Sequence, residues 1–436
     1  MSGRDDIPEE RIIHELDGVL PGEIDRRKFL TGTVGVMGAM MFAGCGGDGG
    51  GSTDGDGGSG DGSDDDGGGN GDGGDGASGG DSGGDGGGES GFMDETTAAF
   101  TTPWKKEPSW GHAHVAEGRG YWEDAGVPNI DGQAGNGSDT ESQNIGVGNK
   151  PMGIASLTTA VKFLPATEET DQLNMTMMAL ARGRPLLSFI YRKDMMESRT
   201  DLAGKSVLLS SGFAAASWPV YPQLAGVAAE NIETIPASEN VSAAALADGE
   251  IQGIWGSIDL LPDYRAQVDA DLGVVPLTAF GPFYGFPLWV NDDWFESKEN
   301  NVEFVSQVIT GYFKAVKWGL LNQDAYLDYL QNEVNTNLQT WTEEERKGQH
   351  SVNAAQAITL DMKENGLGYF TEEGMQFTLD NAGPALVDEE LRPASELTDT
   401  RAWEHSEKVT FTDDEWDQLA ETAGFVWDLF EEAESG

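Results

Sequence analysis

One stretch near the N-terminus cannot contribute to a folded core. Residues 46–91 are almost wholly Gly, Asp and Ser, and they include no Lys, Arg or aromatic side chain. This composition cannot bury enough apolar surface to offset the conformational entropy lost on folding. We therefore expect residues 46–91 to form a disordered tether, which repulsion among its acidic groups extends. The folded part then begins near Phe92, and its roughly 345 residues are enough for a well-buried protein of two lobes.

The segment before the tether has the layout of an export signal. Arg26 and Arg27 precede the uncharged run 31–41, and small residues then lead to Cys45, the only cysteine. The apolar run is shorter than the roughly 20 residues that span a bilayer, which favours a cleaved signal over a membrane anchor. Residues 1–45 resemble a twin-arginine signal joined to a lipobox. The resemblance implies cleavage before Cys45 and a lipid on its thiol, which would anchor the mature chain to the extracellular face of the cell membrane.

The chain is strongly acidic, with a formal net charge of −50. The folded part holds 21 basic and 56 acidic residues, so it still carries −35 without the signal and the tether. A charge of this sign and size repels nucleic acid and anionic membrane surfaces, so we expect no nucleic-acid partner. The acidic blocks are spread along the chain and are similar to those of proteins from very salty habitats, where counter-ions screen self-repulsion. The charge therefore indicates a halophilic habitat rather than a ligand.

Short apolar runs alternate with helical patterns from residue 98 onward, which indicates an α/β protein with open sheets. The expected strands are 98–104, 186–191, 207–209, 251–255, 274–275 and 286–290. Apolar residues between Val302 and Leu320 recur at helical spacing. Capping boxes start at Thr342 and Thr412, and a final helix is expected to carry its apolar stripe from Trp416 to Phe430.

Five segments in order resemble one family, the taurine, nitrate and thiamine-precursor group of solute-binding proteins that feed ABC importers. The segments are Trp110–Gly126, Gly135–Ser138, Ile145–Ala155, Asp201–Val207 and Ala243–Trp255. Each is only a strand, turn and helix signature, and the similarity spans about residues 98 to 330.

The resemblance implies a two-lobed fold of the type 2 periplasmic-binding-protein kind, in which each lobe is an open mixed sheet flanked by helices. Residues 92–188 and 284–436 would form lobe one, and residues 189–283 lobe two. The chain would cross between lobes near residues 186–195 and 283–290, which would act as the hinge. The expected function is capture of a small organic solute between the lobes and its delivery to an ABC permease in the membrane. We expect a monomer without a cofactor.

Ligands of open α/β sheets bind at the carboxyl ends of strands and at helix N-termini. Placing the expected strands on that scheme gives ten candidate binding residues: Trp104, Trp110, Ser138, Ser156, Ser211, Gly212, Trp218, Trp255, Asp259 and Tyr284. The serines and Gly212 would offer hydrogen bonds to ligand oxygens. Asp259 would bind an amine or amidine, or else cap the helix after it. Several aromatic side chains together favour a ring-bearing or heterocyclic solute over a small sulfonate or nitrate.

Other polar residues are weaker candidates. Arg182 and Arg184 could pair with an acidic group of the ligand, but a solvated edge of the hinge is the preferred interpretation of both. His112 and His114 form a His-x-His pair that a helix would point in different directions, so we expect no metal site. The chain has no motif of a serine hydrolase, zinc protease or phosphate-binding loop, which fits a binding protein rather than an enzyme. A sensory binding protein that docks on a membrane receptor and, less favoured, a secreted hydrolase remain alternatives.

Overall fold

The computed structural model describes residues 98–165, 173–297, 300–424 and 426–430. The expected signal, the lipidation site at Cys45 and the tether all lie outside these residues. Among the described residues, no helix is both long and apolar enough to cross a membrane.

The first sheet contains five strands in the order β2-β1-β3-β10-β4. Their bounds are β1 Ala98–Thr102, β2 Ile130–Ala134, β3 Met152–Ile154, β4 Met175–Arg182 and β10 Phe286–Asn291. β1 pairs in parallel with β2 and β3, whereas β10 runs antiparallel to both β3 and β4. The sheet is therefore mixed, because the strand that returns late in the sequence inserts between two earlier ones.

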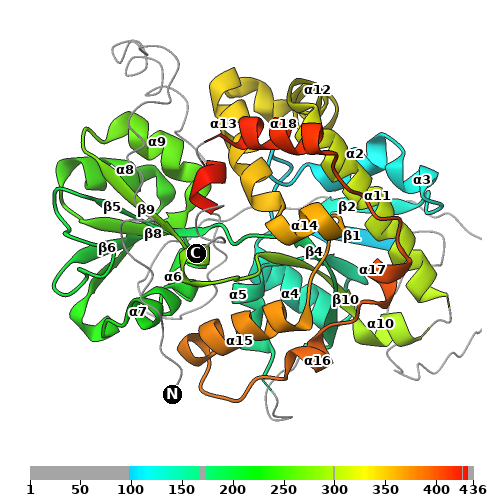
Figure 1. Ribbon diagram of the computed structural model, residues 1–436, viewed down its shortest axis with the longest axis horizontal. Helices are drawn as coiled ribbons and strands as arrows, with labels where there is room; N and C mark the ends of the chain where they lie inside the picture. The colour runs from blue at the N-terminus through cyan, green and yellow to red at the C-terminus, as the bar shows by residue number, and fades with distance from the viewer. Residues whose placement is uncertain (1–97, 166–172, 298–299, 425, 431–436) are drawn as a thin grey trace, which may run out of the picture. The chain divides into compact units, whose positions relative to one another are not determined.

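The second sheet repeats this plan with five strands in the order β7-β6-β8-β5-β9. Their bounds are β5 Leu187–Arg192, β6 Ser206–Leu209, β7 Glu233–Pro236, β8 Gly253–Ser257 and β9 Leu272–Pro276. β6 pairs in parallel with β7 and β8, and β5 runs antiparallel to β8 and β9. Figure 1 shows the labelled strands β5, β6, β8 and β9 in green, within this sheet.

Helices cover both faces of the second sheet, and the strands alternate accordingly. On β5, Phe189 packs with Tyr221 of α7, whereas Ile190 packs in the cluster that holds Leu246 of α8. In Figure 1, α8 and α9 lie on one face of this sheet and α6 and α7 on the other. The short elements that follow strands are α6 Gly212–Ser217, α7 Val220–Ala225, η4 Ala229–Asn231, α8 Glu239–Asp248, η5 Ile258–Leu260, α9 Leu261–Gln267 and η6 Leu277–Phe280.

The first sheet is covered by helices from both halves of the chain. Those before β10 are α2 His112–Gly118, α3 Tyr121–Asp124, α4 Ser138–Gly146, α5 Leu157–Ala160 and η3 Val161–Phe163. Those after it are α10 Asp292–Glu296, α11 Asn301–Leu321, α12 Gln323–Tyr329, η7 Leu330–Val334, η8 Thr336–Thr340, α13 Glu343–Ala357, α14 Leu360–Asn365, α15 Glu372–Leu386, α16 Ala394–Leu397, α17 Arg401–His405 and α18 Asp413–Ala423.

The core of the first lobe forms where β1 meets α3 and α11. Phe100 lies 5.5 Å from Trp122 and 5.3 Å from Tyr312, measured between ring centroids. The Trp122 indole N–H donates to the carbonyl of Val308 at 3.1 Å. A Cβ on Gly311 would come within 2.3 Å of the Trp122 ring, so this close packing requires glycine. The helical spacing of apolar residues in 302–320 is thus confirmed as a buried face of α11.

Two of the helix predictions have different outcomes. Both capping boxes form, with the Thr342 and Thr412 hydroxyls accepting from the N–H groups of Glu345 and Glu415. The single final helix is wrong, because α18 ends at Ala423 and Gly424 has a positive φ of 55°. Residues 426–430 form a separate helical turn, so the expected apolar stripe spans two segments.

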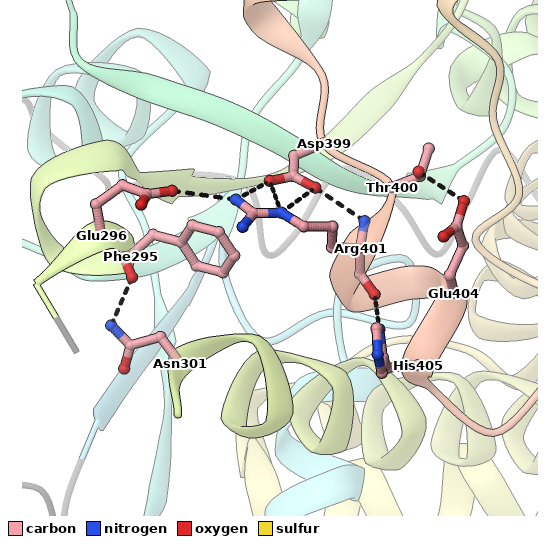
Figure 2. Close-up of polar contacts among 8 residues, drawn as sticks. All are labelled: Phe295, Glu296, Asn301, Asp399, Thr400, Arg401, Glu404 and His405. Atoms are coloured by element: carbon pink, nitrogen blue, oxygen red, sulfur yellow. Dashed lines mark hydrogen bonds and ion pairs between the residues drawn. The ribbon is translucent and has the colours of Figure 1, made fainter. Parts of the chain in front are cut away.

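An ion-pair network ties α17 to α10. The Arg401 guanidinium donates to Asp399, at 2.8 Å from Nε to Oδ2, and to Glu296, at 3.1 Å from Nη2 to Oε1 (Figure 2). Asn301 donates to the carbonyl of Phe295 at 2.9 Å, which links the start of α11 to the end of α10. Arg401 is 53% exposed, so we assign this network an orienting role more than a stabilising one.

The two segments that connect the sheets lie side by side. The first joins β4 to β5 through residues 183–186, and the second joins η6 to β10 through residues 281–285. The Gly285 N–H donates to the Gly183 carbonyl at 3.1 Å. A Cβ on Gly285 would lie 2.3 Å from the carbonyl oxygen of Arg184, so the second segment can approach the first only with glycine. The expected domain boundaries at 188/189 and 283/284 stay predictions.

Candidate functional site

Arg182, the last residue of β4, has a buried guanidinium without a hydrogen-bond partner. The residue is only 2% exposed, and neither Nη1 nor Nη2 has a partner among the described residues. Its Cζ lies 3.7 Å from the ring centroid of Trp110, and Trp110 packs edge-on against Phe286 at 4.9 Å. The pairing of Arg182 with Phe286 on β10 explains why these three side chains meet. The predicted solvated hinge edge is therefore wrong for Arg182.

Arg184 is also buried, but its guanidinium is occupied. It is 1% exposed, its Nη1 donates to the carbonyl of Ala355, and its Cζ lies 5.0 Å from the ring centroid of Phe430. The solvated interpretation is wrong here as well. Because Arg184 bonds the last turns of α13, it serves to hold the crossover against that helix.

The helix α13 presents amide side chains to this region, of which Asn353 and Gln356 are buried and Gln349 is half-buried. Gln349, Asn353 and Gln356 follow each other at spacings of four and three residues, which places them on one face of the helix. Asn353 is 0% exposed and neither of its amide atoms has a partner among the described residues. The same holds for Nε2 of Gln356 and Oε1 of Gln349. We call these three residues the amide stripe.

Backbone hydrogen bonds fix the end of α13 beside Arg182. The N–H groups of Gly183 and Arg184 donate to the carbonyls of Ala357 and Gln356, at 3.2 and 3.0 Å. The end of α13 is therefore bonded to the two residues that follow Arg182. The helix also contacts η5, which contains Asp259 of the second sheet's lobe.

Electrostatics around Arg182 involve groups from both lobes. Burial lowers the pKa of Arg182 to about 10, and the nearby groups Tyr312, Tyr326 and Asp259 oppose this shift. Burial raises the pKa of the Asp259 carboxyl, while a hydrogen bond from Ser257 and the charge of Arg182 lower it. Burial also raises the pKa of Glu107, the charge of Lys105 lowers it, and the charge of Asp259 adds to the effect of burial. Carboxyl groups and cations thus interact in a partly desolvated region.

His112 lies beside the same cluster. Its ring stacks on Tyr326 at 4.9 Å, and burial, together with the charge of Arg182, holds its pKa well below the usual value. The described residues contain no group of three His, Cys, Asp or Glu side chains that could hold a metal.

Some of the ten candidate residues lie near this cluster. The Trp110 ring lies against the Arg182 guanidinium, and the charge of Asp259 opposes the lowering of the Arg182 pKa by burial. Ser138 begins α4 and Ser156 follows β3, and the structure brings them together, because the Ser156 N–H donates to the Ser138 hydroxyl at 3.0 Å. The next residue, Leu157, donates its N–H to Gly285 at 3.0 Å, so this pair lies beside the crossovers. Trp104 follows β1 and is 44% exposed.

The remaining candidates have partners within the lobes. The Ser211 hydroxyl caps α6 by accepting from the Ala214 N–H at 3.2 Å, and Gly212 is exposed in the same short helix. Trp218 is 6% exposed, and Trp255 is 0% exposed with its indole N–H bonded to Ser217. These two indoles form part of the second sheet's core. The Tyr284 hydroxyl accepts from the Thr371 N–H at 2.9 Å at the start of α15.

A surface hollow lies elsewhere in the first lobe. It has a volume of about 300 Å³ and is lined by residues 126–129 and by Asn300, Glu303, Phe304 and Gln307. None of these side chains holds a buried polar atom that lacks a partner. The Arg182 cluster is the stronger candidate, because unpartnered buried polar groups call for a bound molecule or water.

Comparison with known proteins gives one family and several structures. Residues 108–320 match the model of the NMT1/THI5 like family. No curated protein sequence matches the chain. Among solved structures, the periplasmic aliphatic sulphonate binding protein SsuA from Escherichia coli is 11% identical. The alignment covers 72% of this chain and 94% of that one, with a TM-score of 0.50.

Two further structures are similar to the same extent. The periplasmic nitrate-binding protein NrtA from Synechocystis PCC 6803 is 9% identical over 77% of this chain and 91% of its own, with a TM-score of 0.50. A protein from Bordetella bronchiseptica RB50 is 14% identical over 71% and 96%, also with a TM-score of 0.50. The predicted fold class is confirmed: the chain has a two-lobed α/β fold of the periplasmic-binding-protein kind.

Proposed function

We propose that this chain is an exported solute-binding protein of an ABC importer, which captures a small organic solute between its two lobes and presents it to a membrane permease. The fold, the family match and the names of similar structures, which are those of binding proteins, support a binding role over an enzymatic one. The observation that carries the proposal is the pair of crossovers, where the Gly285 N–H donates to the Gly183 carbonyl. Beside them lies the buried Arg182 of the first lobe, and α13 of that lobe contacts η5 of the second.

The hinge would operate at these segments. A transporter must distinguish loaded from empty protein, and a ligand shifts that equilibrium only by contacts that differ between the two states. Groups from both lobes meet beside the Gly183 to Gly285 hydrogen bond, so a ligand held there would contact both lobes only when they are closed. The deep burial of Arg182 also requires opening for a ligand to enter.

The class of ligand is a finer part of the proposal. A ring-bearing solute was favoured from the aromatic candidates, but Trp218 and Trp255 lie in the core and Tyr284 is bonded to α15. Among the aromatic candidates, the exposed ring of Trp104 is the surface that still supports a ring. A sulfonate or nitrate is compatible with the cation at Arg182.

The location of the protein follows from its N-terminal sequence. Arg26, Arg27 and Cys45 support export by the twin-arginine route and a lipid anchor on the extracellular face of the membrane. We further propose that the protein acts as a monomer without a cofactor.

The test is a screen for ligands followed by small-angle scattering. The purified protein, in multimolar KCl, is heated with pyrimidines, flavins, sulfonates, nitrate and amino acids. A ligand at 100 times its Kd stabilises the folded state by about 2.7 kcal/mol, a shift that is readily measured. Scattering with each hit should give a smaller radius of gyration. A bound solute that leaves the radius unchanged, or that is chemically converted, would contradict the proposal.

A further inference from the structure

The chain buries several polar side-chain atoms in one place without satisfying them. Arg182 contributes two nitrogen atoms, and the amide stripe adds both amide atoms of Asn353, Nε2 of Gln356 and Oε1 of Gln349. Arg182, Asn353 and Gln356 are each at most 2% exposed. Backbone bonds from Gly183 and Arg184 to Ala357 and Gln356 hold the end of α13, from which these amides project, against the residues that follow Arg182.

Burying polar atoms without hydrogen bonds destabilises the folded protein unless another molecule supplies the missing partners. A buried charge without a partner costs several kcal/mol even after relaxation, and a buried amide without a hydrogen bond costs about 1–3 kcal/mol. Asp259 lowers this cost for Arg182 only through its field, since neither Nη atom of Arg182 has a hydrogen-bond partner in the described residues. Native proteins keep such groups where a bound molecule or ordered water satisfies them, and a ligand would supply those partners here.

The chemistry of the atoms defines what would fit. Arg182 offers two parallel N–H donors that match the two oxygens of a carboxylate or the oxygens of a sulfonate or phosphate. Gln356 adds a further donor, while Asn353 offers both a donor and an acceptor. The site therefore suits an anionic group and, beside it, a group that both donates and accepts hydrogen bonds.

We infer that α13 and Arg182 together form the ligand-recognition site, and that this site binds a small organic anion. The charged oxygens of the anion accept hydrogen bonds from Arg182. A polar group beside them pairs with Asn353 and Gln356. This inference rests on the proposed function and deepens it. The amide stripe lies beyond residue 320, where the family match ends, so this part of the site belongs to the portion of the chain that the match does not cover. Discrimination among anions would come from α13.

The first arm of the test measures stability without added ligand. Arg182→Met removes the charge while keeping an unbranched, flexible side chain beside Trp110, and Asn353→Leu keeps the size of the amide. If these groups serve binding, the variants unfold at the same urea concentration as the wild type or at a higher one, because an unsatisfied charge or amide has been removed. A structural role predicts the opposite, a clear loss of stability in both variants.

The second arm measures binding by calorimetry of the full protein at one fixed, multimolar KCl concentration. The probes are orotate, benzoate, benzenesulfonate and nitrate, with uracil and benzamide as uncharged counterparts of orotate and benzoate. We expect at least one organic anion to bind and its uncharged counterpart to bind far more weakly. Arg182→Met should weaken that anion about 100-fold and Asn353→Leu about tenfold. Glu344→Gln, at an exposed position on α13, should leave the affinity unchanged.

Each contrary result has a definite meaning. The inference is overturned if no anion of the panel binds, if an anion binds equally well to Arg182→Met, or if the two variants are simply destabilised. Binding of uracil or another neutral solute, with compaction in scattering, would refute the anion site while leaving the proposed function intact. Absence of any bound solute together with absence of compaction would count against both.

Discussion

Three histidines are buried in the first lobe, and they make its stability depend on pH. His350 of α13 is 0% exposed, its Nε2 donates to the carbonyl of Gly319 at 3.0 Å, and its Nδ1 accepts from Gln323 at 3.1 Å. These two bonds suit only the neutral ring. Burial lowers the pKa of His350 to about 4, and burial likewise lowers the pKa of His114 to about 4.

We predict that His350 reduces the stability of the protein in mild acid. Because the pKa in the folded state lies below the unfolded value of about 6.5, the unfolded chain binds the proton more tightly. The contribution is fully present above pH 6.5 and is lost as the pH falls toward 4. Between pH 8 and pH 5 it amounts to about 2 kcal/mol of unfolding free energy. Urea denaturation measures the fall in unfolding free energy between pH 8 and pH 5. This fall should be about 2 kcal/mol smaller in His350→Gln than in the wild type.

The matched control for this experiment is His405→Gln, at an exposed histidine of α17. If the two variants change the pH dependence equally, burial of His350 is not its cause. His112 and His114 remain in both proteins, so the variant reduces the dependence on pH without removing it.

Cys45 gives a second prediction at the scale of one residue. If a lipid on its thiol anchors the protein, the wild type should sediment with membranes and enter the detergent phase. Cys45→Ala should be released into the medium, because the loss of the lipid removes the apolar surface that binds the bilayer. Mass spectrometry of the wild-type N-terminus should find the lipid on residue 45. Retention of Cys45→Ala on the membrane would contradict the anchor.

At the scale of elements, α13 has a dual importance, because it both joins the crossovers and carries the amide stripe. Its first turn is fixed by a complete capping box, in which the Thr342 hydroxyl accepts from the Glu345 N–H and the Glu345 carboxylate accepts from the Thr342 N–H. Three acidic residues in the first turn add a favourable interaction with the helix dipole. The helix is thereby stabilised at its start and held by Gly183 and Arg184 at its end.

We predict that Thr342→Ala lowers the unfolding free energy by about 1 kcal/mol, because it leaves N–H groups of the first turn without an acceptor. Thr342→Ser keeps the hydroxyl and should cost much less. Urea titrations at constant salt measure the difference. Equal losses in the two variants would show that the methyl group, and not the cap, matters at this position.

The sequence predicted where most strands lie, but it did not predict on which face of an element each side chain lies. Strands β5, β6, β8, β9 and β10 were predicted within a few residues, because apolar runs bounded by turn residues are a strong signal. β4 was missed, since Met175, Met177 and Leu180 favour helices and only sheet pairing makes the segment a strand. Trp255 was expected in the cleft but points into the core, because a one-residue change of register exchanges the two faces of a strand. Trp218 follows α6 and also packs in that core.

Arg182 and the amide stripe could not be ranked from the sequence for a related reason. An arginine at a strand end is usually solvated, and only the packing of Trp110 and of α13 buries this one. The spacing of Gln349, Asn353 and Gln356 on one helix face was a usable signal, because alanines and Val352 in the same helix imply burial. Amides on the buried face of such a helix need hydrogen-bond partners, and the identity of those partners depends on tertiary packing that the sequence does not display.

The whole folded part carries many more acidic than basic residues, and most of its described ion pairs are partly exposed. Exposed pairs contribute little, typically 0–1 kcal/mol each, so they cannot offset the mutual repulsion of a net charge of −35. Repulsion acts over the Debye length, which falls from about 10 Å at 0.1 M salt to about 3 Å at 1 M. The compact state therefore gains more from screening than the expanded unfolded chain does.

We predict that the urea midpoint rises steeply as KCl increases from about 0.1 M to about 2 M, most of the rise coming where the Debye length becomes shorter than the spacing of surface charges. NaCl at equal ionic strength should act similarly, since screening depends on charge and not on the identity of the ion. A neutral osmolyte such as sucrose stabilises by exclusion from the surface and should not reproduce the steep initial rise. If sucrose matches KCl, or if the midpoint is the same at both salt concentrations, self-repulsion does not limit the stability of this fold. The acidic surface would then need an explanation other than adaptation to salt.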